Sequence, residues 1–381
     1  MRNWSGTLFF SREAISRAVG PVTDLSGVPF PLLPLRLARR LVLATTGKRY
    51  NYDHEPALAR FCGAYFSRLV ARTRPDVIFS PAGSTSLAHL DTEVPIVYFT
   101  DGPWSVIRNY NPAYANVVGR TAASAEELEQ RSLRRADVVL VSSQWARDAV
   151  VRYYGTDPAK VYNVGIGANL PDPPTRKEVL PRRKADRTIR LLMVAVQWES
   201  KGGPIAREAL QRLLEMGYDA RLTVVGCSVP AADLHPRMEV VPFLNKQVLA
   251  DRLRLEQLWK TADFFILPTR AEAAGVVFCE ASAYAIPSLA PRTGGVPSLV
   301  VDGRNGWTLP CEARGDCYAR RIAKLVDEPE RYARLCESSR DEFEQRLSWD
   351  AWGGQVARII RDAFPHLAGR LPNSVPAIAA R

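Results

Sequence analysis

Several patterns that mark common classes of protein are missing from this sequence of 381 residues. No apolar run reaches the length of a membrane span, and Met1 is followed by Arg-Asn-Trp-Ser-Gly where a signal peptide would have an apolar stretch. The cysteines lack the paired spacing of a zinc site or of a disulfide framework. They are Cys62, Cys227, Cys279, Cys311, Cys317 and Cys336. We therefore expect a cytoplasmic protein with reduced thiols.

Motifs for three kinds of ligand are also missing. No G-x-G-x-x-G follows an apolar strand, which argues against a dinucleotide oxidoreductase. No cluster of His, Cys or Asp has metal-ligand spacing, so we expect activity without a metal ion. No RNA-binding motif appears, although the net charge is +11. A basic chain attracts anions, so nucleotide diphosphates or an acidic membrane surface are the expected partners rather than nucleic acid.

The chain length and the order of its apolar segments predict two α/β domains. Apolar strands alternate with helical patterns, which favours parallel sheets covered by helices on both faces. Residues 170–187 are rich in proline and charge and form the best linker. We expect an N-terminal domain at 1–169, a C-terminal domain at 188–346, and a last helix with a tail at 347–381. The expected strands are 22–25, 76–80, 95–99, 137–142, 161–164, 190–196, 222–225, 240–243, 264–267 and 287–290.

The most informative stretch runs from Pro268 to Gly295. It follows a buried strand and holds two glutamates, of which Glu272 precedes a helix start and Glu280 lies inside that helix. A second strand then runs into Thr293-Gly-Gly-Val-Pro297, where a further short helix begins. In open α/β sheets ligands bind at this edge, and helix N-termini attract phosphate. Carboxylates at the same edge suit a ligand rich in hydroxyl groups.

The residue types in this stretch, and the order in which they follow one another, resemble those of the retaining glycosyltransferases of family 4, also called glycosyl transferases group 1. The resemblance covers most of the C-terminal half and, more loosely, the N-terminal half. The matching residues are Leu267-Pro268-Thr269, Glu272, Gly275, Phe278, Glu280-Ala281, Pro287, Thr293 to Pro297, and Asp302-Gly303-x-Asn305-Gly306.

The resemblance implies the GT-B fold, in which two Rossmann-like domains face a central cleft and a C-terminal helix crosses back to the N-terminal domain. It implies that Glu272 holds hydroxyls of the donor sugar, that Glu280 holds ribose hydroxyls, and that the donor is linked to UDP or GDP with no cofactor. The other residues that it places at the donor are Gly6, Thr7, Lys201, Gly202, Arg270, Gly275, Val276, Gly294 and Gly295.

Lys201 stands in Gln197-Trp-Glu-Ser-Lys-Gly-Gly203, between an apolar strand and the helix expected at 204–216. A cation beside a glycine-rich helix start suits a diphosphate, whereas the alternative is a solvated surface lysine. Many family members carry an arginine five residues earlier, where this chain has Val196. Arg270 is a candidate replacement for that second cation, or else a surface residue.

The N-terminal half offers fewer candidates. Trp4 to Thr7 resembles the loop after the first strand of a Rossmann-like domain, yet no strand precedes it, so we expect the true start of the protein to lie upstream of Met1. A helix at 8–19 follows. By resemblance Asp101 lies near the reacting carbon, and its alternative role is the N-cap of a helix at 103–108.

Residues 31–44 predict an amphipathic helix that carries Arg36, Arg39 and Arg40 on one face, with leucines over much of the rest. Such a helix can lie on an anionic membrane, as family members that modify lipids often do. We favour the alternative, in which the leucines pack on the core and the arginines form a solvated edge.

The resemblance therefore implies a retaining glycosyltransferase that moves a sugar from a nucleotide-diphosphate sugar to a hydroxyl acceptor on a glycan or lipid, with peripheral contact at the inner face of the membrane as an option. Three other readings of the same residues stay open. These are a two-carboxylate glycosidase, which fits a phosphate-binding loop poorly, a nucleotide-sugar epimerase with the same architecture, and a subunit that binds nucleotide without catalysis.

Overall fold

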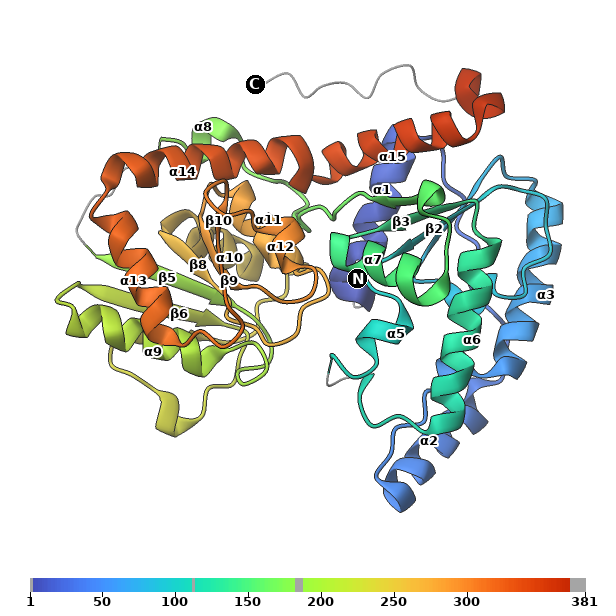
Figure 1. Cartoon of the computed structure of the whole chain (residues 1–381), viewed down its shortest axis with the longest axis horizontal. Coiled ribbons are helices and arrows are strands. Elements are labelled where there is room, and N and C mark those ends of the chain that lie inside the picture. The colour runs from blue at the N-terminus through green and yellow to red at the C-terminus, as the bar shows by residue number, and fades with distance from the viewer. Residues whose placement is uncertain (1–2, 112–113, 182–187, 371–381) are drawn as a thin grey trace. The chain divides into compact units, whose positions relative to one another are not determined.

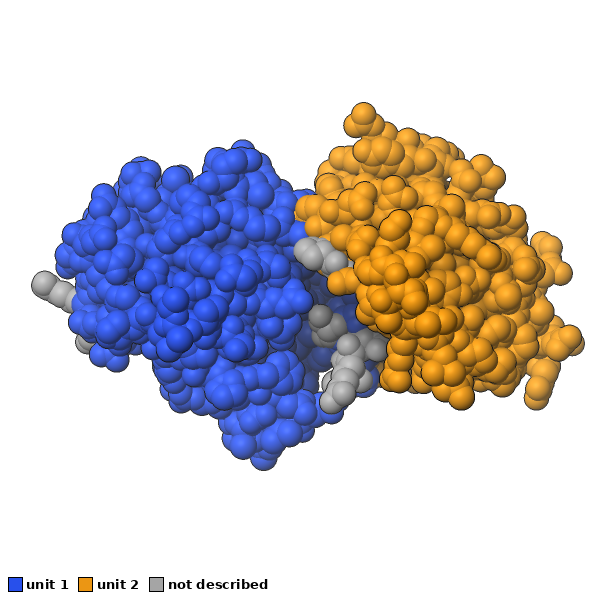
Figure 2. Space-filling model, turned by 90° about the horizontal axis from the view of Figure 1, so that it is seen from below, with its two compact units in different colours: residues 1–10, 165–352, 376–381 blue, residues 11–164, 353–375 orange. Residues whose placement is uncertain are grey.

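The computed structural model describes residues 3–111, 114–181 and 188–370. The chain divides into two compact units (Figure 2). Unit 1 contains residues 1–10, 165–352 and 376–381, and unit 2 contains residues 11–164 and 353–375. Each unit is built on its own parallel sheet, as expected for the GT-B fold.

The sheet of unit 1 has six strands in the order β10-β9-β8-β5-β6-β7 (Figure 1). Every pair in it is parallel, and the register places Leu191 opposite Phe264 and Phe265 opposite Ser288. The central strands are almost wholly apolar because helices cover both of their faces. The strands are β5 (Ile189–Val194), β6 (Ala220–Val225), β7 (Met238–Val241), β8 (Phe264–Ile266), β9 (Ser288–Pro291) and β10 (Gly306–Leu309).

Helices α9 and α13 pack against each other in unit 1, and α11 and α14 also pack together. The helices of this unit are α8 (Arg176–Val179), α9 (Gly203–Glu215), α10 (Leu249–Thr261), α11 (Val276–Ala283), α12 (Val296–Leu299), α13 (Gly315–Val326) and α14 (Pro329–Glu342). Two features differ from the sequence prediction. Strand β10 was not expected, and the predicted linker contains the short helix α8, which Thr175 and Glu178 stabilise with a capping box.

The sheet of unit 2 has four parallel strands in the order β1-β2-β3-β4. Among the residues that the structure describes, no strand precedes β1, so the strand predicted at 22–25 is wrong. Those residues form no regular secondary structure between α1 and α2, and they are not part of the described sheet. The strands are β1 (Ile78–Pro81), β2 (Ile96–Thr100), β3 (Val138–Val141) and β4 (Val161–Asn163).

The helices of unit 2 lie around this sheet (Figure 1). They are α1 (Thr7–Ala18), α2 (Leu32–Thr46), α3 (Pro56–Thr73), α4 (Ser84–Leu87), α5 (Trp104–Ile107), α6 (Gly119–Arg135) and α7 (Gln144–Tyr154). Helix α1 straddles the division of the chain, since its first four residues are grouped with unit 1. No residue of α2 is buried, so the expectation that its leucines pack on the core is wrong.

Helix α2 is held by one side only. Leu35, Ala38 and Val42 are partly buried on the side that meets the short 3-10 helix Tyr52–His54. The opposite side leaves Leu33, Leu37 and Leu41 exposed by 68%, 55% and 64%. These three leucines recur every four residues and form one stripe, which we call the leucine stripe.

The C-terminal helix α15 (Trp349–Ala363) begins in unit 1 and continues in unit 2 from Gly353 onward. A Cβ at Gly353 would lie 3.1 Å from the Ala14 carbonyl oxygen and 3.1 Å from Ala18 Cβ, so the helix packs closely on α1. The predicted return of the last helix to the N-terminal domain is confirmed. Figure 1 shows the helix in red.

Candidate active site

Two loops of unit 1 meet at the carboxyl edge of its sheet, one after β5 and one after β8. The backbone N–H of Arg270 donates to the Ser200 carbonyl oxygen at 3.1 Å. Gly202 lies so close to the other loop that an added Cβ would be 2.0 Å from the Pro268 carbonyl oxygen. Its φ of +77° is also a conformation that favours glycine. The glycine therefore lets the two helix starts, α9 and α11, approach each other.

Lys201 and Glu272 form an ion pair across these loops. Lys201 Nζ lies 2.7 Å from Glu272 Oε2, and the two side chains are 24% and 18% exposed. The carbonyl oxygen of Glu272 accepts a hydrogen bond of 3.1 Å from the backbone N–H of Gly295. The residues predicted to hold the sugar and the diphosphate are thus in contact, and the loop before α12 is joined to them.

Glu280 lies in the second turn of α11 and is fully buried. Its Oε1 accepts a hydrogen bond of 2.5 Å from Nζ of Lys246, a residue of the loop between β7 and α10. Its Oε2 is buried and has no hydrogen-bond partner among the residues that the structure describes. A buried carboxylate oxygen without a partner is costly, which makes it a candidate acceptor for a ligand hydroxyl.

The predicted glycines lie at helix starts. Gly202 and Gly275 are the N-caps of α9 and α11 and have φ of +77° and +82°. Val276 is the first residue of α11, and Gly294 and Gly295 lead into α12. At the start of α9 the Gly203 N–H donates to the Trp198 carbonyl oxygen at 2.8 Å and Pro204 has no N–H, so the capacity of this edge to bind an anion lies in the first N–H groups of α11 and in the dipoles of both helices.

Comparison with known proteins agrees with this arrangement. The family model "Glycosyl transferases group 1" matches residues 177–342, and "Glycosyltransferase Family 4" matches residues 25–170. The two matches fall on the two halves of the chain and leave little of it uncovered.

The chain belongs to glycosyltransferase family 4.

Among curated relatives, a D-inositol 3-phosphate glycosyltransferase of Catenulispora acidiphila is 26% identical over 250 residues, which is 61% of this chain. The chain spans only 57% of the length of that relative. Among solved structures, sucrose-phosphate synthase from Thermosynechococcus elongatus has a TM-score of 0.59 and 18% identity, covering 83% of this chain and 80% of its own. Anabaena HepE in complex with UDP and glucose has a TM-score of 0.55 and 17% identity, covering 78% and 81%. These structural likenesses establish the fold.

One predicted residue of this family 4 protein lies away from the ion pair. The guanidinium of Arg270 donates to the carbonyl oxygen of Cys311, in the loop between β10 and α13. Val196, where many relatives carry an arginine, is 62% exposed. Arg270 is therefore directed at a backbone carbonyl rather than held beside Lys201 as a second cation.

The predicted residues of the N-terminal part are placed as follows. Gly6 has φ of +90° and precedes the buried Thr7, which begins α1. Asp101 is partly buried in the loop after β2, in unit 2, and its carbonyl oxygen accepts a hydrogen bond from Ser142 Oγ at 3.4 Å. The N-cap position of α5 belongs to Pro103, so the alternative role of Asp101 as that cap is wrong.

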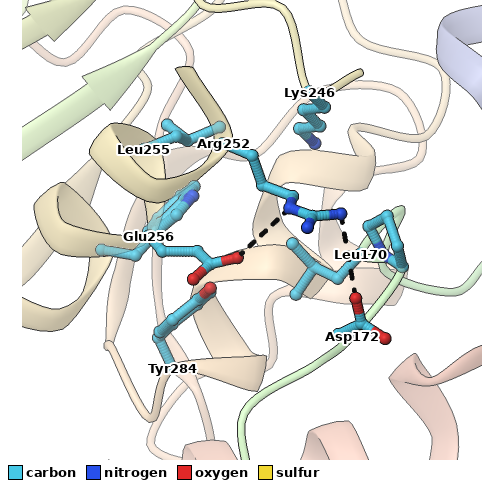
Figure 3. Close-up of a pocket in the computed structure, with 9 residues that line it drawn as sticks. Leu170, Asp172, Lys246, Arg252, Leu255, Glu256 and Tyr284 are labelled. Atoms are coloured by element: carbon cyan, nitrogen blue, oxygen red, sulfur yellow. Dashed lines mark ion pairs between the residues drawn. The ribbon is translucent and has the colours of Figure 1, made fainter. Parts of the chain in front are cut away.

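A pocket that Lys246 helps to line lies in unit 1 (Figure 3). Its charged side chains are engaged with one another, since Arg252 lies 3.8 Å from Asp172 and 3.9 Å from Glu256. It is lined by Leu170, Pro171, Asp172, Lys246, Arg252, Leu255, Glu256, Trp259 and Tyr284. Because Arg252 is already paired with carboxylates, this pocket is a weaker candidate for an anionic ligand than the helix starts.

Sequence reasoning missed Lys246. The residue stands in a polar loop, Asn245-Lys-Gln247, with no glycine motif and no helix start to mark it. Its partner Glu280 is 34 residues away in the chain. Only the fold, which brings the loop after β7 beside α11, reveals the pair.

Proposed function

We propose that the protein is a retaining glycosyltransferase that moves a sugar from a nucleotide-diphosphate sugar to a hydroxyl acceptor in the synthesis of a glycan or glycolipid. The observation that carries the proposal is the Lys201–Glu272 pair at 2.7 Å, set between the starts of α9 and α11. A cation, two helix starts and a carboxylate match the diphosphate and the hydroxyls of such a donor.

The reaction can be assigned to these groups. The acceptor oxygen attacks the anomeric carbon from the side that the diphosphate leaves, and the C–O bond to the diphosphate breaks. The leaving phosphate oxygen takes the proton of the acceptor hydroxyl. Lys201 and the N–H groups at the start of α11, after Gly275, stabilise charge that grows on the diphosphate. Glu272 holds sugar hydroxyls, and Asp101 acts near the reacting carbon.

The donor nucleotide can be found by thermal shift with UDP, GDP, ADP and NAD, each in the presence of a chelator. A nucleotide at 100 times its dissociation constant stabilises the folded state by about 2.7 kcal/mol. A shift with UDP or GDP but not with NAD supports the proposal. A shift with NAD alone contradicts it.

The acceptor is best sought among polyols and lipids. Because curated relatives are named D-inositol 3-phosphate glycosyltransferases, inositol 3-phosphate is the first soluble acceptor to test. Release of nucleoside diphosphate that requires an acceptor separates a transferase from an epimerase, which needs none. Nucleotide binding without any turnover would favour the non-catalytic subunit, and the anomeric configuration of the product tests retention.

We further propose that unit 2 contacts an anionic membrane through α2, at the inner face where nucleotide sugars are supplied. The leucine stripe is exposed, and Arg36 and Arg40 lie exposed beside it. Exposed apolar side chains flanked by cations are what an interfacial helix presents to anionic lipid. No helix among the described residues is long and apolar enough to cross a membrane, so contact would be peripheral.

A further inference from the structure

The ammonium of Lys246 is the feature that the proposed function leaves unexplained. Glu280 is fully buried, whereas the side chain of Lys246 is 34% exposed, so the ion pair runs from the surface to a buried carboxylate. The same ammonium donates to the carbonyl oxygen of Asn169 at 3.3 Å. Two acceptors on separate segments therefore fix its position.

The two oxygens of the Glu280 carboxylate have different surroundings because Lys246 contacts only one of them. Oε1 is engaged by Lys246 at 2.5 Å, and Oε2 is buried without a partner among the described residues. Burying a carboxylate without a partner is very unfavourable, so the ammonium of Lys246 offsets the cost of placing Glu280 in this apolar helix. The contact at Oε1 also fixes the direction in which Oε2 can accept a hydrogen bond.

The backbone anchor of Lys246 is itself firmly placed. Asn169 is buried, and its Oδ1 accepts a hydrogen bond of 2.9 Å from the indole N–H of Trp349. The neighbouring Ala168 donates its N–H to the Leu347 carbonyl oxygen at 2.9 Å. The ammonium of Lys246 is thus bound to a buried, hydrogen-bonded segment, so its position can set the orientation of the Glu280 carboxylate.

We propose that Lys246 is a positioning residue for nucleotide recognition: it holds the Glu280 carboxylate through Oε1 and leaves Oε2 to accept a hydrogen bond from a vicinal diol, such as the ribose of the nucleotide. The inference rests on the proposed function, because it needs a ribose at Glu280. On this proposal Lys246, in the loop after β7, affects nucleotide binding through Glu280 and does not contact the phosphates.

The test measures binding of UDP or GDP, whichever the wild type binds, and of the matching 2′,3′-dideoxy nucleotide, by calorimetry. We expect the wild type to prefer the ribonucleotide. Lys246→Met should lose about tenfold or more in affinity for the ribonucleotide and keep its affinity for the dideoxy form, since only the diol reaches Glu280. Lys246→Arg should restore part of the preference because it restores the charge.

Two controls make the outcomes distinct. Thermal melts of each variant check the fold, and Lys246→Met/Glu280→Gln removes both charges in case the single variant is too unstable to study. Equal losses for both nucleotides in Lys246→Met would overturn the inference, because they would indicate a phosphate contact or a structural role. A wild type that binds no nucleotide, or does not distinguish the two, would instead overturn the proposed role of Glu280 itself.

Discussion

At the scale of single residues, Lys201 is surrounded by groups that suit a diphosphate. It lies one residue before the N-cap of α9 and contacts Glu272, which precedes α11. In this position the ammonium of Lys201 can contact the Glu272 carboxylate and also the phosphate oxygens of a bound nucleotide. Its role should therefore be visible as a difference between ligands with and without phosphates.

Lys201→Met is expected to weaken binding of UDP or GDP by about tenfold to a hundredfold, which corresponds to one lost charge-assisted contact. Binding of the uncharged nucleoside should change little. Lys324→Met, at an exposed lysine in the last turn of α13, is the matched control. Equal losses for nucleotide and nucleoside would contradict the assignment of Lys201 to the diphosphate.

Glu129 of α6 is a second buried carboxyl group, and it lies outside the site. Its Oε1 accepts a hydrogen bond of 2.8 Å from the Tyr98 hydroxyl. Burial raises the pKa of Glu129 to about 7. The folded protein therefore keeps this proton between about pH 4.5 and 7, where the unfolded chain has released it. The folded state binds more protons there, so its stability should fall as the pH rises through this range.

Glu129→Gln removes that ionisation. From pH 5 to pH 8, the wild type should lose roughly 2 kcal/mol more of its free energy of unfolding than the variant does. Urea titrations at both pH values measure the difference. Glu127→Gln, at an exposed glutamate on the same helix, should give no comparable pH dependence. If both variants behave alike, Glu129 is already ionised at neutral pH.

Residue types in a short ordered string could be read from the sequence, whereas contacts between distant loops could not. Glu272 in the loop, Glu280 in the helix and Lys201 at a glycine-rich helix start were all placed in the right kind of element. Their mutual distances, the turn of Arg270 toward Cys311 and the pairing of Lys246 depend on how separate loops pack. No local propensity encodes such packing.

At the scale of elements, the start of α9 depends on one glycine. Gly202 and Gly217 both have φ in the left-handed region, at +77° and +89°. An added Cβ would collide with the loop after β8 at Gly202 but would meet nothing within 4 Å at Gly217. The two positions therefore separate backbone strain from close packing.

Gly217→Ala should lower the free energy of unfolding by about 1 kcal/mol, the strain of the left-handed conformation alone. Gly202→Ala should cost more and should also weaken nucleotide binding, since the carbonyl of Pro268 must move. Chemical denaturation and calorimetry measure the two effects. Identical behaviour of the two variants would show that the two loops adjust without cost.

Helix α2 gives a prediction of another kind. Leu33→Ser/Leu37→Ser/Leu41→Ser should reduce binding to vesicles of anionic lipid by about tenfold or more, because the exposed stripe supplies the apolar area. The melting temperature should hardly change, since none of these side chains is buried. Co-sedimentation with anionic and neutral vesicles makes the comparison.

The control for that experiment is Leu249→Ser/Leu253→Ser, at two exposed leucines of α10. This variant should bind vesicles like the wild type. Raised salt should weaken wild-type binding if Arg36 and Arg40 contribute. Vesicle binding that survives the triple variant would locate the contact elsewhere or exclude it.

Most strands and long helices were predicted within a few residues, whereas β10, the short helix α8 and the chain at 22–25 were not predicted correctly. Strand β8 is wholly apolar and β5 is interrupted only by Arg190, so the composition of both strands indicates burial. Strand β10 contains Trp-Thr after Asn305-Gly306 and looks like part of a loop until β9 pairs with it. For α2, amphipathic spacing shows that one side is apolar but cannot show whether the protein itself covers that side.

At the scale of the whole molecule, we expect the protein to catalyse transfer without a metal ion. No group of three or more His, Cys, Asp or Glu side chains in the described ranges is arranged to hold a metal ion. We expect transfer activity to stay within about twofold of its initial value in excess chelator, since cationic and N–H groups stabilise the leaving diphosphate. Complete loss that magnesium restores would contradict this expectation.

The split of α15 between the two units has a consequence for anyone who recombines such proteins. Unit 2 is not one continuous stretch of the gene, because the chain returns to it at Gly353, after residues 165–352 of unit 1 have been encoded. A chimera that exchanges only residues 11–164 would set a foreign α1 against the native Gly353, where a Cβ has little room. Unit 2 of this protein should therefore be exchanged as two segments together, so that α15 and α1 come from the same parent.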